Sequence, residues 1–92
     1  MNYKLSVIIH GTESRRPWFS KKTYNLSEVI HIKRLIRYLK EINRRSNDSE
    51  TEILTYMINL LDKGLISEFA DFIISGKNAI YFEGEWLELI IL

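Results

Sequence analysis

The chain has 92 residues, with 13 Lys+Arg, 12 Asp+Glu, a net charge of +1 and no cysteine. This length predicts a single domain, 1–92, built on one hydrophobic core. The absence of cysteine excludes disulfides, thiolate zinc sites and cysteine nucleophiles. Residues 1–46 carry 11 basic and 3 acidic residues, a net charge of +8, whereas residues 47–92 carry 2 and 9, a net charge of −7. This asymmetry indicates a charged binding surface.

The N-terminal part predicts one strand or a hairpin. Residues 4–10 are rich in β-branched side chains, and Gly11 ends the run. Residues 18–24 alternate imperfectly between two faces, which favours a second strand, with a structured loop as the alternative.

Three helices are predicted in the middle of the chain. Helix 27–45, opened by Asn25 or Ser27, places its apolar residues, including Val29, within about 140° and its basic residues on the opposite side. Ser49 has capping-box spacing with Glu52 for a second helix, 50–63, which ends at Gly64 in a left-handed conformation. Ser67 caps a third helix, 67–75, which ends at Gly76.

The C-terminal residues predict a hairpin. Residues 78–82 and 85–91 read as strands joined by Glu83-Gly84. The order ββαααββ indicates an α+β fold, in which a small antiparallel sheet packs with about three helices. The last strand, ending in Leu92, is expected to be an apolar sheet edge, which would pair in a homodimer.

No motif of catalysis or cofactor binding is present. His10 and His31 form no metal-binding spacing, and we expect structural or surface roles for both. The glycines are isolated, so no phosphate-binding loop is expected. We therefore expect no catalytic residue, cofactor or metal, with a small hydrolase centred on a histidine as the alternative.

The basic residues of the N-terminal half are the strongest functional signal. Cations beside the aromatic residues Trp18 and Phe19 are typical of surfaces that bind phosphate and stack bases. The alternative is that the helix has a solvated charged face and that the two aromatic residues belong to the core. The candidate basic binding surface comprises Arg15, Arg16, Lys21, Lys22, Lys33, Arg34, Arg37, Lys40, Arg44 and Arg45.

These features predict a small non-enzymatic protein that binds another protein through a charged surface. The composition, with 14 Ile and 2 Ala, is typical of AT-rich genomes, and suggests a viral or mobile-element inhibitor of a host nucleic-acid-handling or defence complex. The alternative is a small nucleic-acid-binding protein that uses residues 15–45. Helices 50–63 and 67–75 resemble a helix-turn-helix in spacing. The second helix is acidic, however, and DNA would repel it, which argues against recognition of bases in the major groove by this helix. No apolar run is long enough to span a membrane, and a cytoplasmic location is expected.

Overall fold

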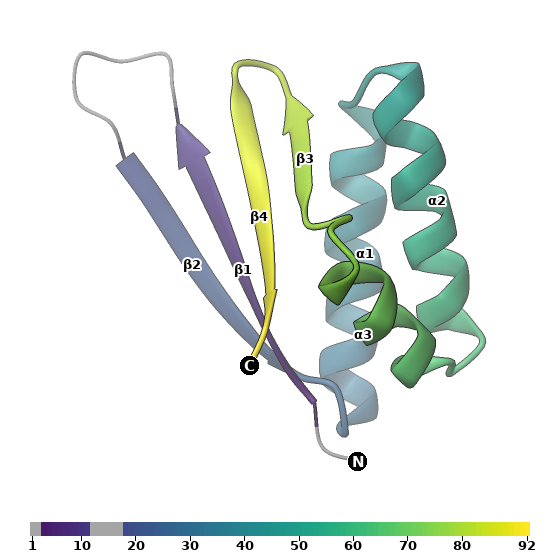
Figure 1. Ribbon diagram of the computed structural model, residues 1–92. Helices are drawn as coiled ribbons and strands as arrows, with labels where there is room; N and C mark the ends of the chain where they lie inside the picture. The colour runs from purple at the N-terminus through teal and green to yellow at the C-terminus, as the bar shows by residue number, and fades with distance from the viewer. Residues whose placement is uncertain (1–2, 12–17) are drawn as a thin grey trace.

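The computed structural model describes residues 3–11 and 18–92 and has an α+β architecture, which confirms the predicted class and the order ββαααββ (Figure 1). Residues 18–25 form a strand, so the prediction of an N-terminal hairpin is also confirmed. The elements are β1 (Lys4–Gly11), β2 (Trp18–Asn25), α1 (Val29–Arg44), α2 (Asp48–Asp62), α3 (Ile66–Ile74), β3 (Ala79–Phe82) and β4 (Glu85–Ile91).

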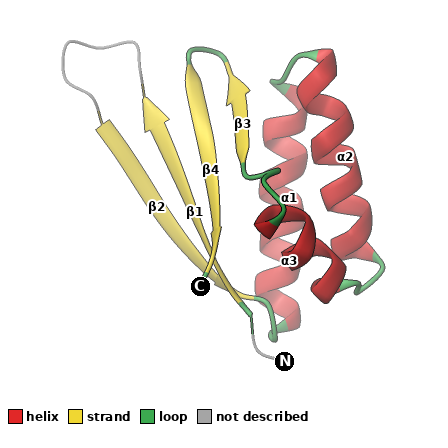
Figure 2. Ribbon diagram, viewed as in Figure 1, coloured by secondary structure: helices red, strands yellow, loops and turns green. Residues whose placement is uncertain are grey.

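The four strands form one antiparallel sheet in the order β2-β1-β4-β3. Strand β1 is central and pairs on one side with β2, where Lys4 lies opposite Asn25, and on the other with β4, where Leu5 lies opposite Ile91. The strands stand on one side of the molecule and the helices on the other (Figure 2). The sheet therefore has one face against the helices and one face, here called the outer face, without them.

The hydrophobic core lies between the sheet and the helices. Alternate residues of a strand point to opposite faces, so Leu5 and Val7 of β1 meet Leu87 and Leu89 of β4 on the helix side, and all four are buried. Tyr24, Leu26, Ile80 and Phe82 extend this cluster along the sheet side. The helices contribute Leu35, Leu39, Ile42, Leu54, Met57, Ile58, Leu60, Leu61, Phe69 and Ile73.

Two expectations about apolar residues are wrong. The last strand, β4, is not an edge, because β1 covers one side and β3 the other. β4 therefore has no free edge that could pair with a second subunit. The homodimer stays a prediction, but β4 no longer supports it. Val29 does not join the apolar face of α1, since its side chain is 68% exposed in the first turn of the helix.

The helix ends also differ in detail from the expected caps. At α2 the cap is Asn47, whose Oδ1 accepts a hydrogen bond from the Glu50 N–H at 3.2 Å, and Ser49 donates its hydroxyl to the same oxygen at 3.0 Å. Helix α3 begins at Ile66 without a side-chain cap, so Ser67 is not the cap either. Both caps were expected two residues too late, because the N-cap positions are Asn47 and Leu65. At α1 the N-cap is Glu28, which forms no side-chain cap hydrogen bond, so neither Asn25 nor Ser27 caps this helix.

Replacement of Asn47 by alanine is expected to lower the free energy of unfolding by about 1 kcal/mol, because the cap of α2 is lost. The Ser49→Ala variant is the matched control. We expect it to lower the free energy of unfolding by only a few tenths of that value, because the Ser49 hydroxyl caps no backbone N–H. Urea unfolding followed by circular dichroism measures both values. A larger loss for Ser49→Ala than for Asn47→Ala would contradict the assignment of the cap.

The predicted turn at Glu83-Gly84 is confirmed. Both residues have positive φ, 43° and 73°, as the two-residue turn of a twisted hairpin requires. Glycine adopts this conformation freely, whereas Glu83 does so at a steric cost. Glu83 also forms an ion pair with Arg45, which follows α1.

Among the residues that the structure describes, no helix has both the length and the apolar character needed to cross a membrane.

Candidate functional site

The exposed side of α1 carries a line of cations. At about 100° per residue, Lys33, Arg37, Lys40 and Arg44 fall within roughly 60° of one another, and Arg34 lies at their flank. Leu39 and the other buried residues of α1 lie on the opposite side of the helix. From Lys33 to Arg44 the line is roughly 16 Å long. Because the apolar side of α1 packs against the core, the cations on its other side face the solvent.

Most of these cations have no carboxylate partner. Arg44 Nη1 lies 2.9 Å from Glu41 Oε2, an exposed pair one turn apart. No other ion pair within residues 3–11 and 18–92 involves the line of cations. Four of its five members are thus free to meet an external anion. We call these five residues together with Lys22 of β2 the basic face; its members are Lys22, Lys33, Arg34, Arg37, Lys40 and Arg44.

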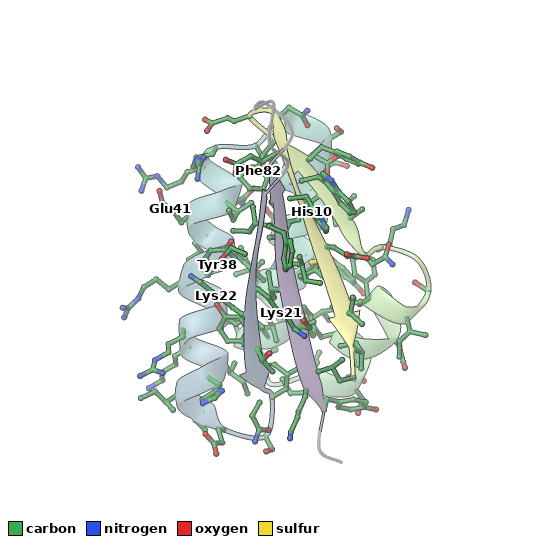
Figure 3. The ribbon with its side chains drawn as sticks, turned by 90° about the vertical axis from the view of Figure 1, so that its left-hand side faces the viewer. His10, Lys21, Lys22, Tyr38, Glu41 and Phe82 are labelled. Carbon is green, nitrogen blue, oxygen red and sulfur yellow. The ribbon has the colours of Figure 1, made fainter. Side chains whose placement is uncertain are left out.

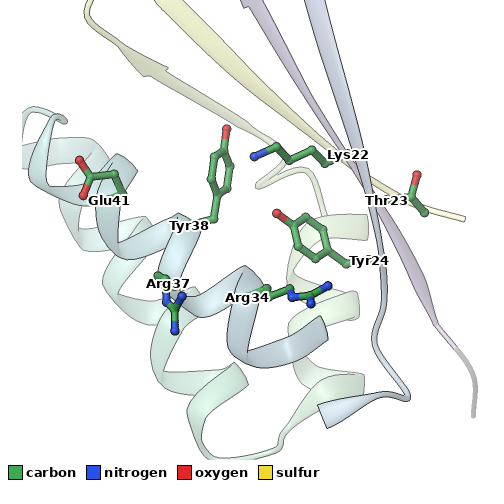
Figure 4. Close-up of a pocket in the computed structure, with 7 residues that line it drawn as sticks. All are labelled: Lys22, Thr23, Tyr24, Arg34, Arg37, Tyr38 and Glu41. Carbon is green, nitrogen blue, oxygen red and sulfur yellow. The ribbon is translucent and has the colours of Figure 1, made fainter. Parts of the chain in front are cut away.

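A groove of about 700 Å³ runs between the edge strand β2 and helix α1. Lys22 extends across it from the strand, and its Nζ lies 4.6 Å from the centre of the Tyr38 ring, a cation–π contact (Figure 4). The groove contains three cations and one carboxylate, so its electrostatic potential favours an anion. Its lining residues are Lys22, Thr23, Tyr24, Arg34, Arg37, Tyr38 and Glu41.

Tyr38 forms the inner wall of the groove. Its hydroxyl is buried and has no hydrogen-bond partner among the described residues. This burial, with smaller effects from Tyr24 and Glu85, raises the pKa of Tyr38 to about 12, because the ionised form would lose its hydration. Burial also raises the pKa of Tyr24 above its ordinary value. The groove thus holds neutral tyrosines beside permanent positive charge at all physiological pH values.

These shifts predict a loss of stability in alkali. Between pH 10 and about pH 12 the unfolded chain releases the Tyr38 proton while the folded chain keeps it, so the free energy of unfolding falls as the pH rises. Below pH 10 the effect is absent. Chemical denaturation at pH 9, 10.5 and 11.5 should show this decrease, and Tyr38→Phe should reduce it. Tyr56→Phe is the control, since this exposed tyrosine lies on α2. An equal effect of both substitutions would contradict the account.

The remaining basic residues do not join the same surface. Arg45 turns toward the sheet, where its Nη2 lies 2.8 Å from Glu83 Oε2 and its guanidinium lies over the Phe82 ring. Lys21 and Lys22 leave β2 on opposite sides, with Lys22 toward Tyr38 and Lys21 toward the outer face (Figure 3). The expectation that all ten cations form one surface is therefore wrong for Arg45 and Lys21.

The rest of that expectation lies outside the described residues. This applies to Arg15 and Arg16 and to the side chain of Trp18. Phe19 is described, and its side chain is 71% exposed on the outer face, so its alternative placement in the core is wrong.

An aromatic row crosses the outer face and was not recognised from the sequence. The strand register places Phe19 opposite His10, His10 opposite Trp86, and Trp86 opposite Tyr81. The His10 and Trp86 rings are stacked, with centroids 4.0 Å apart and planes 9° apart. Tyr81 continues the row at 6.2 Å from Trp86. The signal in the sequence was the alternation within each strand, but the row exists only through the pairing of strands.

Both histidines have structural partners. Nδ1 of His31 accepts a hydrogen bond from the Asn25 backbone N–H at 2.9 Å, and its Nε2 lies 3.2 Å from Glu28 Oε2. His10 Nε2 lies 3.1 Å from Glu88 Oε1. Asn25 pairs with Lys4, six residues from His10 along β1, so the two imidazoles lie roughly 20 Å apart. They cannot share one metal ion, and no metal-binding cluster occurs among the described side chains.

Comparisons of the chain with protein-family models, with curated proteins and with solved structures find no match.

Proposed function

We propose that the protein binds nucleic acid through the basic face of α1 and β2. The observation that carries the proposal is the set of five cations, Lys22, Lys33, Arg34, Arg37 and Lys40, that have no carboxylate partner in the described chain. The chain has 12 acidic residues, yet these cations form no ion pair with them among the described residues. They are therefore available to replace the counterions of a polyanion. We place this function in the cytoplasm, and assign no reaction to the protein.

The arrangement of the cations supports nucleic acid as the ligand. The basic face is a roughly 16 Å line along a convex helix beside a groove, a shape that follows a chain of phosphates. Arg34 and Arg37 at the groove offer planar guanidinium groups, which bind phosphate oxygens with two hydrogen bonds each.

The test is direct binding of labelled oligonucleotides, single-stranded and duplex, measured by fluorescence anisotropy at about 50 mM and about 200 mM salt. We expect binding at the lower salt concentration and a steep loss at the higher one, because phosphate contacts release counterions. Absence of binding to both nucleic acids at the lower concentration would contradict the proposal. Binding that is insensitive to salt would contradict the role of the basic face.

A second candidate function is supported by one observation. Val29 and Ile30 are 68% and 56% exposed, and they precede Lys33 on the same side of α1. Exposed aliphatic residues beside cations are typical of a contact with an acidic protein, as an inhibitor of a host nucleic-acid-handling or defence complex would make. This candidate predicts that Val29→Ser/Ile30→Ser weakens capture of a protein partner and leaves oligonucleotide binding unchanged.

A further inference from the structure

We infer that the aromatic row on the outer face of the sheet binds unpaired bases, so that the nucleic acid held by the basic face is single-stranded. This inference rests on the proposed function, because it concerns the bases of the same ligand whose phosphates meet α1 and β2. The row consists of Phe19, His10, Trp86 and Tyr81, one residue from each strand of the sheet. It lies on the face that no helix covers.

One face of the His10 ring stacks on Trp86, and the other has no aromatic neighbour among the described residues. Two rings lying flat on the sheet could not bring their centroids to 4.0 Å, so the parallel rings of His10 and Trp86 stand upright with their faces together. The opposite face of His10 then looks toward β2, where Phe19 lies next in the row. No ring contact joins Phe19 to His10 among the described residues. A planar base can stack there.

Phe19 is able to complete such a stack. Its side chain is 71% exposed on an edge strand, so its ring can change rotamer without disturbing the core. A base inserted beside His10 would gain Phe19 as its second neighbour. Stacking on aromatic side chains tolerates any base, because every base has a π face.

The other end of the row offers a second stacking position. Tyr81 lies on the edge strand β3 and is 58% exposed, with its ring inclined by 26° to Trp86. Three strand spacings separate Phe19 from Tyr81, a distance of roughly 14 Å along the row. The row is therefore long enough for more than one base of the same strand.

The lysines of β2 connect the aromatic row to the basic face. Lys21 lies two residues from Phe19 on the outer face, and Lys22 projects to the other side of the strand, into the groove beside Arg34 and Arg37. A single strand can stack its bases on the outer face while its backbone crosses the edge of β2 toward these cations. A duplex cannot, since its bases are paired and stacked on each other. The nearby carboxylate of Glu88 is engaged by His10.

Nucleic acid fits this face better than a second copy of the chain. A twofold interface would place the same lysine-bearing surface on both partners. Lys21 on the outer face and Lys22 at the strand edge match the phosphates of a nucleic acid strand instead. The charge beside the row therefore favours a polyanion that also carries aromatic rings.

The test compares three labelled ligands by fluorescence anisotropy at low salt: oligothymidylate of roughly 12 nucleotides, its abasic counterpart and a duplex of equal length. The variant Phe19→Ala/Tyr81→Ala should bind oligothymidylate about 20-fold or more weakly, because two stacking contacts are lost, and bind the abasic strand unchanged. Phe19→Tyr/Tyr81→Phe keeps both rings and should restore affinity. Tyr56→Ala removes an exposed aromatic ring from α2 and is the matched control.

The outcomes separate this inference from the proposed function. Wild-type protein that binds neither single strand nor duplex overturns both. Binding of the duplex as tight as that of oligothymidylate, or an alanine variant with unchanged affinity, overturns the inference and leaves the basic face intact. Light scattering that shows a dimer dissociated by Phe19→Ala/Tyr81→Ala, with oligothymidylate binding unchanged, assigns the outer face to a subunit contact and also overturns it.

Discussion

Replacement of both Arg34 and Arg37 by glutamine is expected to weaken the binding of single-stranded nucleic acid by roughly 50-fold at about 50 mM salt. Each phosphate contact on a single strand contributes about 0.7 to the slope of log K against log salt, so the loss of two contacts should reduce the slope by about 1.4. The size of this effect follows from the position of both residues at the groove, where neither has a carboxylate partner among the described residues.

The matched control removes the same charge from elsewhere. Lys63 and Lys77 lie exposed in the acidic half of the chain, so Lys63→Gln/Lys77→Gln changes the net charge by the same two units. We expect this variant to keep the wild-type slope. If both double variants lose affinity equally, net charge rather than the basic face determines binding, and the assignment of the surface is wrong.

Truncation of Leu39 to alanine is expected to lower the free energy of unfolding by about 3 kcal/mol. Leu39 is fully buried in the core cluster between α1 and the sheet, so its removal leaves a cavity that the neighbours cannot fill. For a domain of this size the loss corresponds to a decrease of roughly 12–24 °C in the midpoint of thermal unfolding. Calorimetry or thermal circular dichroism measures it.

The control for this prediction lies on the same helix. Val29 appears in the sequence pattern as part of the apolar face, but it is 68% exposed, and Val29→Ala should change the free energy of unfolding by less than about 0.5 kcal/mol. Similar losses for Leu39→Ala and Val29→Ala would contradict the packing of α1 described above.

The elements of the fold were predictable because they depend on local signals. The apolar period of α1, the Glu83-Gly84 turn and the positive φ of Gly64 after α2 each depend on a few residues. Apart from Val29, they appear where the sequence places them. The cap of α2 was misplaced from Asn47 to Ser49, since both residue types accept backbone hydrogen bonds and the sequence offers them two positions apart.

The pairing of distant strands was not predictable in the same way. The apolar residues of β4 suit an edge or a central position equally well, and only the pairing with β1, which is far away in sequence, makes it central. The aromatic row depends on the same long-range register. Alternation within each strand places Phe19 and Trp86 on the opposite face from the residues next to them in sequence. It does not show that the pairing of β1 with β2 and β4 places His10 between them.

The candidate site was predictable as a list of charges but not as a surface. Periodicity grouped Arg45 with the other cations of α1, because a helical wheel carries no information about what lies beside the helix. The β3–β4 turn approaches the end of α1 and brings Glu83 to Arg45, which removes that cation from the basic face. Likewise, Lys21 and Lys22 are neighbours in sequence, yet their side chains project from opposite faces of the sheet (Figure 3).

The central claim is that nucleic acid contacts α1 and β2, and mapping of amide chemical shifts by NMR tests it most directly. Titration with oligothymidylate should shift the amide signals of residues 33–44 and 19–24 and leave those of α3 unchanged. Shifts confined to α2 and α3, or no shifts at low salt, would contradict the claim.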